Sequence, residues 1–312
     1  MKEFFKETNF RPESKKLLAH CESIVEDYLA QGLRLTLRQL YYQLVTKNLI
    51  PNSEKAYKSV GKLISNGRLA GELDWDAIED RVRVPKVPNE FRGLSHLVDV
   101  ALQSYRLDRW KEQEEYVELW VEKDALAGVL APLAKEYHIT LMVNRGYSSQ
   151  SAMYESANRF CRAADDCKGL HLLYLGDMDP SGEDMVRDIA DRLEMFGVHD
   201  LDVDKIAITM AQVKQYNPPP NPTKLSDSRA AAYVAKYGNS SWEVDALSPP
   251  VLQQIIRDAI EPLVDQELMD EVKDRENRDK RMLRGEVRRL AKKEDEDVDE
   301  EPEDGEDPVD EA

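Results

Sequence analysis

The chain has 312 residues, enough for one large domain or two modest ones, each with its own hydrophobic core. Its 61 acidic and 43 basic side chains give a formal net charge of −18, which at first argues against a polyanionic partner. No stretch approaches the roughly 18 consecutive apolar residues of a membrane span. The N-terminal MKEFFKETNF lacks the apolar segment of a signal peptide, so we expect a cytoplasmic protein with no membrane partner.

The charge is unevenly distributed along the chain. Residues 294–312, EDEDVDEEPEDGEDPVDEA, hold 13 acids and no base, so most of the excess negative charge belongs to this segment. Such a run cannot bury apolar surface, and we predict a disordered acidic tail. Between Gln31 and Ala70 the only acid is Glu54, against seven bases: Arg34, Arg38, Lys47, Lys55, Lys58, Lys62 and Arg68. This local basic patch makes nucleic acid a candidate partner again.

Residues 1–95 are predicted to form a winged-helix (α+β) domain. Helices are expected in PESKKLLAHCESIVEDYLAQG, entered through Pro12, in LRQLYYQLVTKN after Thr36, and in EKAYKSVGKLISNGRLAG after Ser53. IEDRVRVPKVP would then form the wing. In this fold the third helix enters the major groove of double-stranded DNA. The DNA-contacting side chains expected on it, if they are not simply solvated charges, are Lys55, Lys58, Lys62 and Arg68.

The second of these helices carries two adjacent tyrosines. Tyr41 falls on the apolar stripe of the helix, together with Leu37, Leu40, Leu44 and Val45, and is predicted to be a core residue. Tyr42 lies about 100° further round and shares a face with Arg38 one turn earlier. We expect Tyr42 to be exposed. It is either an ordinary surface tyrosine or a nucleophile whose charge Arg38 would stabilise.

Residues 110–265 show strands alternating with helices, which predicts a parallel α/β sheet. The expected strands are YVELWV, ITLMVNR, LHLLYLG and KIAITM. Acidic residues follow two of them: Glu122 after the first, and Asp177 and Asp179 after the third. Because ligands bind beyond the carboxyl ends of such strands, these three side chains should converge. All-oxygen ligation favours Mg²⁺ or Mn²⁺, unless the two aspartates only cap the following helix.

The remaining sequence is less informative. A packing or dimer helix is predicted after Ser248 in SWEVDALSPPVLQQIIRDAIEPLVDQ, and residues 266–293 are predicted to form a solvated charged helix.

Together the motifs resemble a known family. VEKDALAG, NRGYSSQ and LGDMDPSGED are similar to a Toprim domain, with its glutamate and its D-x-D-x-x-G signature. TLRQLYYQLV is similar to the winged-helix tyrosine motif of the DNA topoisomerase VI A subunit, and the chain resembles its reduced "Mini-A" type. The resemblance covers residues 30 to 210. It implies that Tyr42 is the nucleophile, with Arg38 and Glu122 also catalytic, and that Glu122, Asp177 and Asp179 bind the metal.

The resemblance further implies a homodimer in which the tyrosine of one subunit serves the metal site of its partner. A separate ATPase B-type subunit would be needed for strand passage, because no ATPase segment is present in the sequence. We therefore expect a Mg²⁺-dependent, type IIB topoisomerase-like DNA cleavage that leaves a 5′-phosphotyrosyl link. Two alternatives stay open: a Toprim nuclease in which water attacks, and a non-catalytic DNA-binding regulator.

Overall fold

The computed structural model describes residues 2–75, 78, 90–144 and 146–298. Its first part contains the three predicted N-terminal helices: α1 (Pro12–Ala30), α2 (Leu37–Thr46) and α3 (Glu54–Leu69). Local chemistry explains where they begin. Pro12 occupies the first turn of α1, the Thr36 hydroxyl and the Gln39 side chain form a reciprocal capping box on α2, and Ser53 caps α3. The predicted wing, residues 78–88, lies outside the described residues except for Ile78, which forms a bridge with Leu35.

Four parallel strands form the predicted α/β sheet in the order β2-β1-β3-β4. They are β1 (Glu115–Val121), β2 (Thr140–Val143), β3 (Gly169–Leu175) and β4 (Leu201–Ala207). The fourth strand was predicted as KIAITM, which places it too late in the chain. Its sequence LDVDKIA alternates apolar and charged residues because β4 is an edge strand that is only half-buried.

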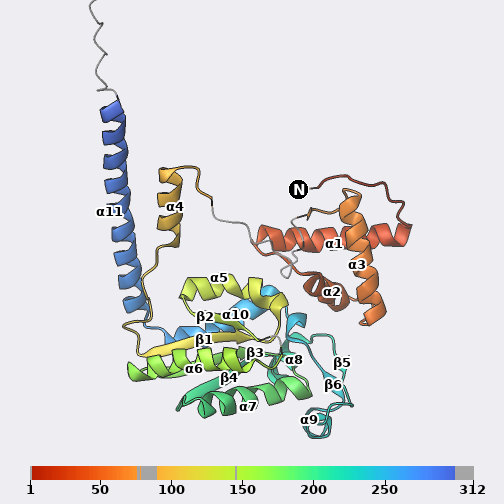
Figure 1. Cartoon of the computed structure of the whole chain (residues 1–312). Helices are drawn as coiled ribbons and strands as arrows, with labels where there is room; N and C mark the ends of the chain where they lie inside the picture. The colour runs from red at the N-terminus through yellow and green to blue at the C-terminus, as the bar shows by residue number, and fades with distance from the viewer. Residues whose placement is uncertain (1, 76–77, 79–89, 145, 299–312) are drawn as a thin grey trace, which may run out of the picture. The chain divides into compact units, whose positions relative to one another are not determined.

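Helices cover both faces of the sheet (Figure 1). One face carries α5 (Ala127–Tyr137) and the predicted α10 (Pro249–Ile260), and the other carries α6 (Gln150–Asp165) and α7 (Pro180–Met195). Trp120 and Tyr174, which are fully buried, pack with residues of α6 and α7 in one hydrophobic core. This three-layer arrangement leaves the carboxyl ends of the strands as the place where loops and polar side chains gather.

The segment between β4 and α10 contains elements that the sequence analysis did not predict: α8 (Met210–Tyr216), β5 (Asn221–Pro222), α9 (Ala230–Tyr237) and β6 (Ser240–Ser241). Met178, in the D-x-D loop, pairs with Trp242 through two backbone hydrogen bonds of 2.8 and 3.0 Å. A 3₁₀ turn follows at Val244–Ala246, and Ala246 packs into the core formed by α1, α2 and α3. This segment therefore contacts both the loop after β3 and α2, the tyrosine helix, which carries Tyr41 and Tyr42.

By their internal contacts the residues divide into two compact units, Met1–Pro85 with Gln113–Val264, and Lys86–Glu112 with Asp265–Ala312. The N-terminal helices and the sheet, predicted as separate domains, thus belong to one unit. None of the described helices combines the length and the apolar character that crossing a membrane requires.

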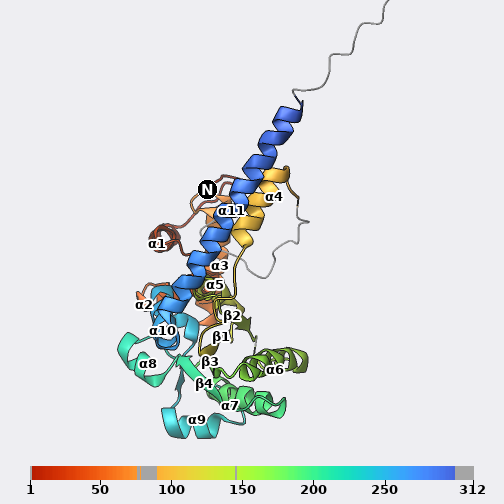
Figure 2. The same ribbon diagram turned by 90° about the vertical axis from the view of Figure 1, so that its left-hand side faces the viewer.

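The second unit contains α4 (Leu94–Ser104), which was not predicted, and α11 (Gln266–Val298), which lie side by side in Figures 1 and 2. Arg109 and Glu276 form a largely buried ion pair of 3.0 Å within this unit. The charged helix predicted for 266–293 is α11, but it continues five residues into the predicted tail, because extending an existing helix costs little. Residues 299–312 lie outside the described part of the chain.

Candidate active site

The carboxyl ends of β1, β2 and β3 lie side by side at one edge of the sheet. The Glu122 N–H donates to the Leu175 carbonyl, and the Asn144 N–H donates to the Val121 carbonyl, both at 2.9 Å. The Asp177 N–H in turn donates to Glu122 Oε2 at 3.0 Å. Glu122, Asn144 and Asp177 are therefore neighbours at one edge.

Asp179 serves as the N-cap of α7. Its Oδ1 accepts hydrogen bonds from the Gly182 N–H at 2.6 Å and from the Ser181 hydroxyl at 2.9 Å. Asp179 therefore caps the helix through Oδ1, whereas Asp177 does not cap it. Gly182 completes the turn because a Cβ at this position would lie 2.2 Å from the Asp177 carbonyl oxygen. The glycine of the D-x-D-x-x-G signature is thus required by close backbone packing.

A lysine that the sequence analysis passed over lies at the centre of the site. Lys123 Nζ contacts Asp177 Oδ2 at 2.8 Å, Glu243 Oε2 at 2.7 Å and Asp245 Oδ1 at 3.2 Å. Asp177 also accepts a hydrogen bond of 2.9 Å from the Val244 N–H. Two sequence features could have indicated this cluster: the lysine directly after Glu122, and the two acids of Glu243-Val244-Asp245 shortly before Pro249.

The same carboxylates also bind the tyrosine helix. Arg38 forms ion pairs with Glu243 and, from Nε to Oδ2 at 2.8 Å, with Asp245, which is fully buried. Glu243 and Asp245 are thus shared between Arg38 on α2 and Lys123 at the sheet edge. These two acids were missed because they follow a strand far along the chain and only tertiary packing brings them to the site.

The ion network shifts the pKa values of its members. Burial raises the pKa of Asp177, and the Lys123 ammonium only partly opposes this rise. Burial alone would also raise the pKa of Glu243, but Lys123 and Arg38 outweigh it and hold that pKa low. The pKa of Lys123 is raised despite burial because Asp245, Asp177 and Glu243 surround it. Lys123 and Arg38 therefore stay charged across the physiological range.

The donor chemistry of this edge fits a hard divalent cation. Glu122, Asp177 and Asp179 supply carboxylate oxygens, and both side-chain amide atoms of the buried Asn144 have no hydrogen-bond partner among the described residues. Within that part of the chain, however, no three acidic, histidine or cysteine side chains are grouped to hold a metal ion. Each predicted ligand instead has a protein partner, and for Asp177 the partner is the Lys123 ammonium.

Tyr42 is buried, contrary to the expectation of an exposed phenol. Its exposed fraction is 3%, because α2 packs against the 3₁₀ turn at Val244–Ala246. The Arg38 guanidinium lies 5.8 Å from the centroid of the Tyr42 ring, as the shared helix face predicted. The Tyr42 hydroxyl accepts a long hydrogen bond of 3.4 Å from Asn221 Nδ2. Burial and the nearby Glu243 raise the pKa of Tyr42.

Tyr41 is a core residue as predicted, but its hydroxyl is also bonded. It donates to Asn52 Oδ1 at 2.8 Å and accepts from the Ser53 N–H at 2.8 Å. A cavity of about 380 Å³ lies beside the tyrosine pair, lined by Arg38, Tyr41, Tyr42, Asn52, Ser53, Glu54, Tyr57, Asn221, Pro222 and Glu243. Tyr42 therefore borders a space that a ligand could enter.

Three of the four predicted DNA-contacting residues lie together on α3. Lys55, Lys58 and Lys62 are exposed and line an open groove of about 480 Å³. Lys58 forms a solvent-exposed ion pair of 2.6 Å with Glu54. Arg68 points elsewhere, since its guanidinium lies over the Trp75 ring at 5.5 Å and donates to the Trp75 carbonyl at 2.9 Å. Arg68 is thus separated from the lysine row.

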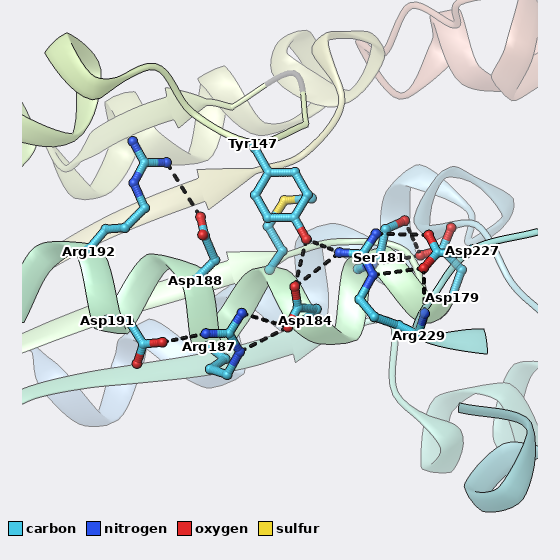
Figure 3. Close-up of polar contacts among 12 residues, drawn as sticks. Tyr147, Asp179, Ser181, Asp184, Arg187, Asp188, Asp191, Arg192, Asp227 and Arg229 are labelled. Carbon is cyan, nitrogen blue, oxygen red and sulfur yellow. Dashed lines mark hydrogen bonds and ion pairs between the residues drawn. The ribbon is translucent and has the colours of Figure 1, made fainter. Parts of the chain in front are cut away.

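Near the start of α7 a further polar cluster surrounds Tyr147, from the loop after β2. Figure 3 shows Tyr147, Asp184 and Arg229 directed toward one another. The Tyr147 hydroxyl donates to Asp184 Oδ2 at 2.8 Å, and Arg229 contacts the same oxygen at 3.0 Å. Asp227 holds the Arg229 guanidinium through bonds of 2.8 Å. This cluster joins the segment before α9 to the helix that Asp179 caps.

The chain was compared with protein-family models and with curated proteins, and no match was found in either comparison.

Proposed function

We propose that this protein cleaves double-stranded DNA, with Tyr42 as nucleophile. The sheet edge that carries Glu122, Asp177 and Asp179, the carboxylate edge, would be the site of a divalent cation. The observation that carries the proposal is the ion network shared by the two sites. Arg38, one turn before Tyr42, and Lys123, next to Glu122, bind the same carboxylates of Glu243 and Asp245. The tyrosine on α2 and the acidic residues at the sheet edge are far apart in the sequence, and this network links them within one compact unit.

In the proposed reaction the Tyr42 oxygen forms a bond to phosphorus while the bond from phosphorus to the 3′ oxygen breaks. The phenol gives up its proton, and the leaving 3′ oxygen takes one up, so the products are a 5′-phosphotyrosyl link and a free 3′ hydroxyl. Tyr42, like any tyrosine, is protonated at neutral pH, and burial raises its pKa further, so the attack needs an acceptor for the proton. Glu243 borders the same cavity, but Lys123 and Arg38 hold its pKa low and make it a weak base, so the proton would pass to water in the cavity.

Glu122, Asp177 and Asp179 would hold Mg²⁺ or Mn²⁺, which when bound supplies positive charge to the scissile phosphate and the leaving oxygen. Arg38 would stabilise charge on the phosphate from the tyrosine side. Lys55, Lys58 and Lys62 would contact the DNA backbone. The resemblance to the topoisomerase VI A family adds a homodimer as the acting species and an ATPase B-type subunit as a partner.

One observation favours a second candidate, a nuclease in which water attacks the phosphate. Tyr42 is 3% exposed and its pKa is raised, and both properties make a poor nucleophile until the chain or the DNA rearranges. In that reaction Tyr42 would only pack against Arg38.

The nature of the bond formed separates the two candidates. Denaturing the protein on end-labelled DNA in Mg²⁺ or Mn²⁺ should trap the label covalently on the chain. Tyr42→Phe should abolish this adduct and leave DNA binding nearly unchanged, because only a weakly bonded hydroxyl is lost. Glu122→Gln should also abolish cleavage while keeping the tyrosine.

Tyr41→Phe is the matched control. It loses two good hydrogen bonds and should lower the free energy of unfolding by about 1 to 2 kcal/mol, yet keep the covalent adduct. If Tyr42→Phe cuts DNA as well as the parent and leaves free 5′ phosphates, water is the nucleophile.

A further inference from the structure

The position of Lys123 suggests a role that the proposed reaction does not include. Its ammonium touches three carboxylates, and one of them, Asp177, belongs to the proposed metal site. Its side chain is 20% exposed, whereas that of Asp245 is 0% exposed. An ammonium surrounded by carboxylates in a poorly solvated site satisfies the same electrostatic demand that a bound metal ion would satisfy.

We propose that Lys123 is a built-in counter-cation that competes with the divalent metal for Asp177. This inference rests on the proposed metal site. Asp177 Oδ2 is 2.8 Å from the ammonium and Oδ1 accepts the Val244 N–H, so both oxygens are engaged. A divalent ion at Asp177 would repel the ammonium at contact distance, and Lys123 must therefore withdraw from Asp177 when the metal binds.

Glu243 and Asp245 determine where the lysine can go. Both already contact Lys123, so the ammonium can leave Asp177 and remain fully paired. The same two carboxylates hold Arg38, one turn before Tyr42. Stronger pairing of Lys123 with them weakens their hold on Arg38. Metal binding at the sheet edge is thereby coupled to the arginine beside the nucleophile, and Glu243 and Asp245 act as positioning residues.

The test is the affinity for Mn²⁺ without DNA, measured by titration with electron paramagnetic resonance detection of the free ion. Lys123→Met should bind Mn²⁺ about tenfold more tightly than the parent, because the competing cation is gone. The double variant K123M/D245N removes one charge of each sign and so does not leave the buried carboxylates one cation short. It should fold, and it should bind Mn²⁺ about tenfold more tightly than Asp245→Asn alone. Lys123→Arg keeps the charge and should show none.

Lys205 provides a matched control at the same edge. Its ammonium contacts the Asp177 carbonyl and Glu183, both at 2.7 Å, but no carboxylate of the proposed metal site. Lys205→Met should therefore change Mn²⁺ affinity by less than about twofold. Mn²⁺ binding by K123M/D245N that is equal to or weaker than that of Asp245→Asn would overturn the counter-cation role while leaving the metal site intact. A parent protein whose Mn²⁺ binding is the same as that of Glu122→Gln would instead remove the metal site itself.

Discussion

At the scale of single residues, the site depends on close contacts that a sequence pattern marks but does not explain. Gly182 is the clearest case, because a Cβ there would meet the Asp177 carbonyl oxygen at 2.2 Å and Asp179 Oδ1 at 3.3 Å. The first of these atoms is backbone and cannot move aside without disturbing the loop that carries both aspartates.

We therefore expect Gly182→Ala to lower the free energy of unfolding by about 3 kcal/mol and to abolish DNA cleavage. Chemical denaturation followed by circular dichroism would measure the first effect. Gly285→Ala is a suitable control, since this glycine lies in α11 and, among the described residues beyond its own helix backbone, no atom lies within 4 Å of the added Cβ. It should raise helix stability by up to about 1 kcal/mol. Equal stability of Gly182→Ala and the parent would show that the loop is more adaptable than this packing implies.

At the scale of elements, α3 presents a row of cations with spacing that suits a polyanion. Lys55, Lys58 and Lys62 are three and four residues apart and share one exposed groove. Replacing all three with glutamine should weaken DNA binding and reduce the slope of log affinity against log salt by about 2.7, or about 0.9 for each lost phosphate contact. Filter binding at several salt concentrations would measure both the affinity and this slope.

Lys15 and Lys16, exposed on α1, supply the control for that measurement. Their replacement with glutamine should leave the salt slope within about 0.5 of the parent value. If the two sets of variants have the same slope, the lysine row of α3 is a solvated surface and not the DNA-binding face.

At the scale of the whole molecule, the question is whether one chain or two build the proposed cleavage site. The ion network joins the tyrosine helix and the carboxylate edge within one chain, whereas the family resemblance implies a tyrosine supplied by the partner subunit. Heterodimers of Tyr42→Phe and Glu122→Gln, purified with two different tags, decide between these arrangements. We expect no cleavage, because the network on which the proposal rests links Tyr42 to the metal site of its own chain, and each chain of the heterodimer lacks one of the two. Nicking of one strand would instead show that the tyrosine of one subunit serves the metal site of its partner.

Local chemistry made much of the fold predictable from the sequence. Pro12, Thr36 and Ser53 start the first three helices through local capping, and the periodic apolar residues after residue 110 indicate strands and helices in alternation. Parallel pairing then brings Glu122 and Asp177 to one edge, since the ends of parallel strands align. The start of β4 was not predicted because this half-buried edge strand alternates apolar and charged residues. Helix α4 was missed although its sequence LSHLVDVALQS has apolar residues at helical spacing.

Only the tertiary structure decided which charges meet. Tyr42 was expected on the surface from its helical position, but the 3₁₀ turn at Val244–Ala246, some 200 residues later in the chain, buries it. The same turn brings Glu243 and Asp245 between Arg38 and Lys123. Helical periodicity reports which face of α2 is apolar and cannot report what packs against the other face. The sequence by itself therefore determined the three N-terminal helices, most of the parallel sheet with its covering helices, and the approach of Glu122 to Asp177, whereas long-range packing decided the burial of the tyrosine and the ion network around it.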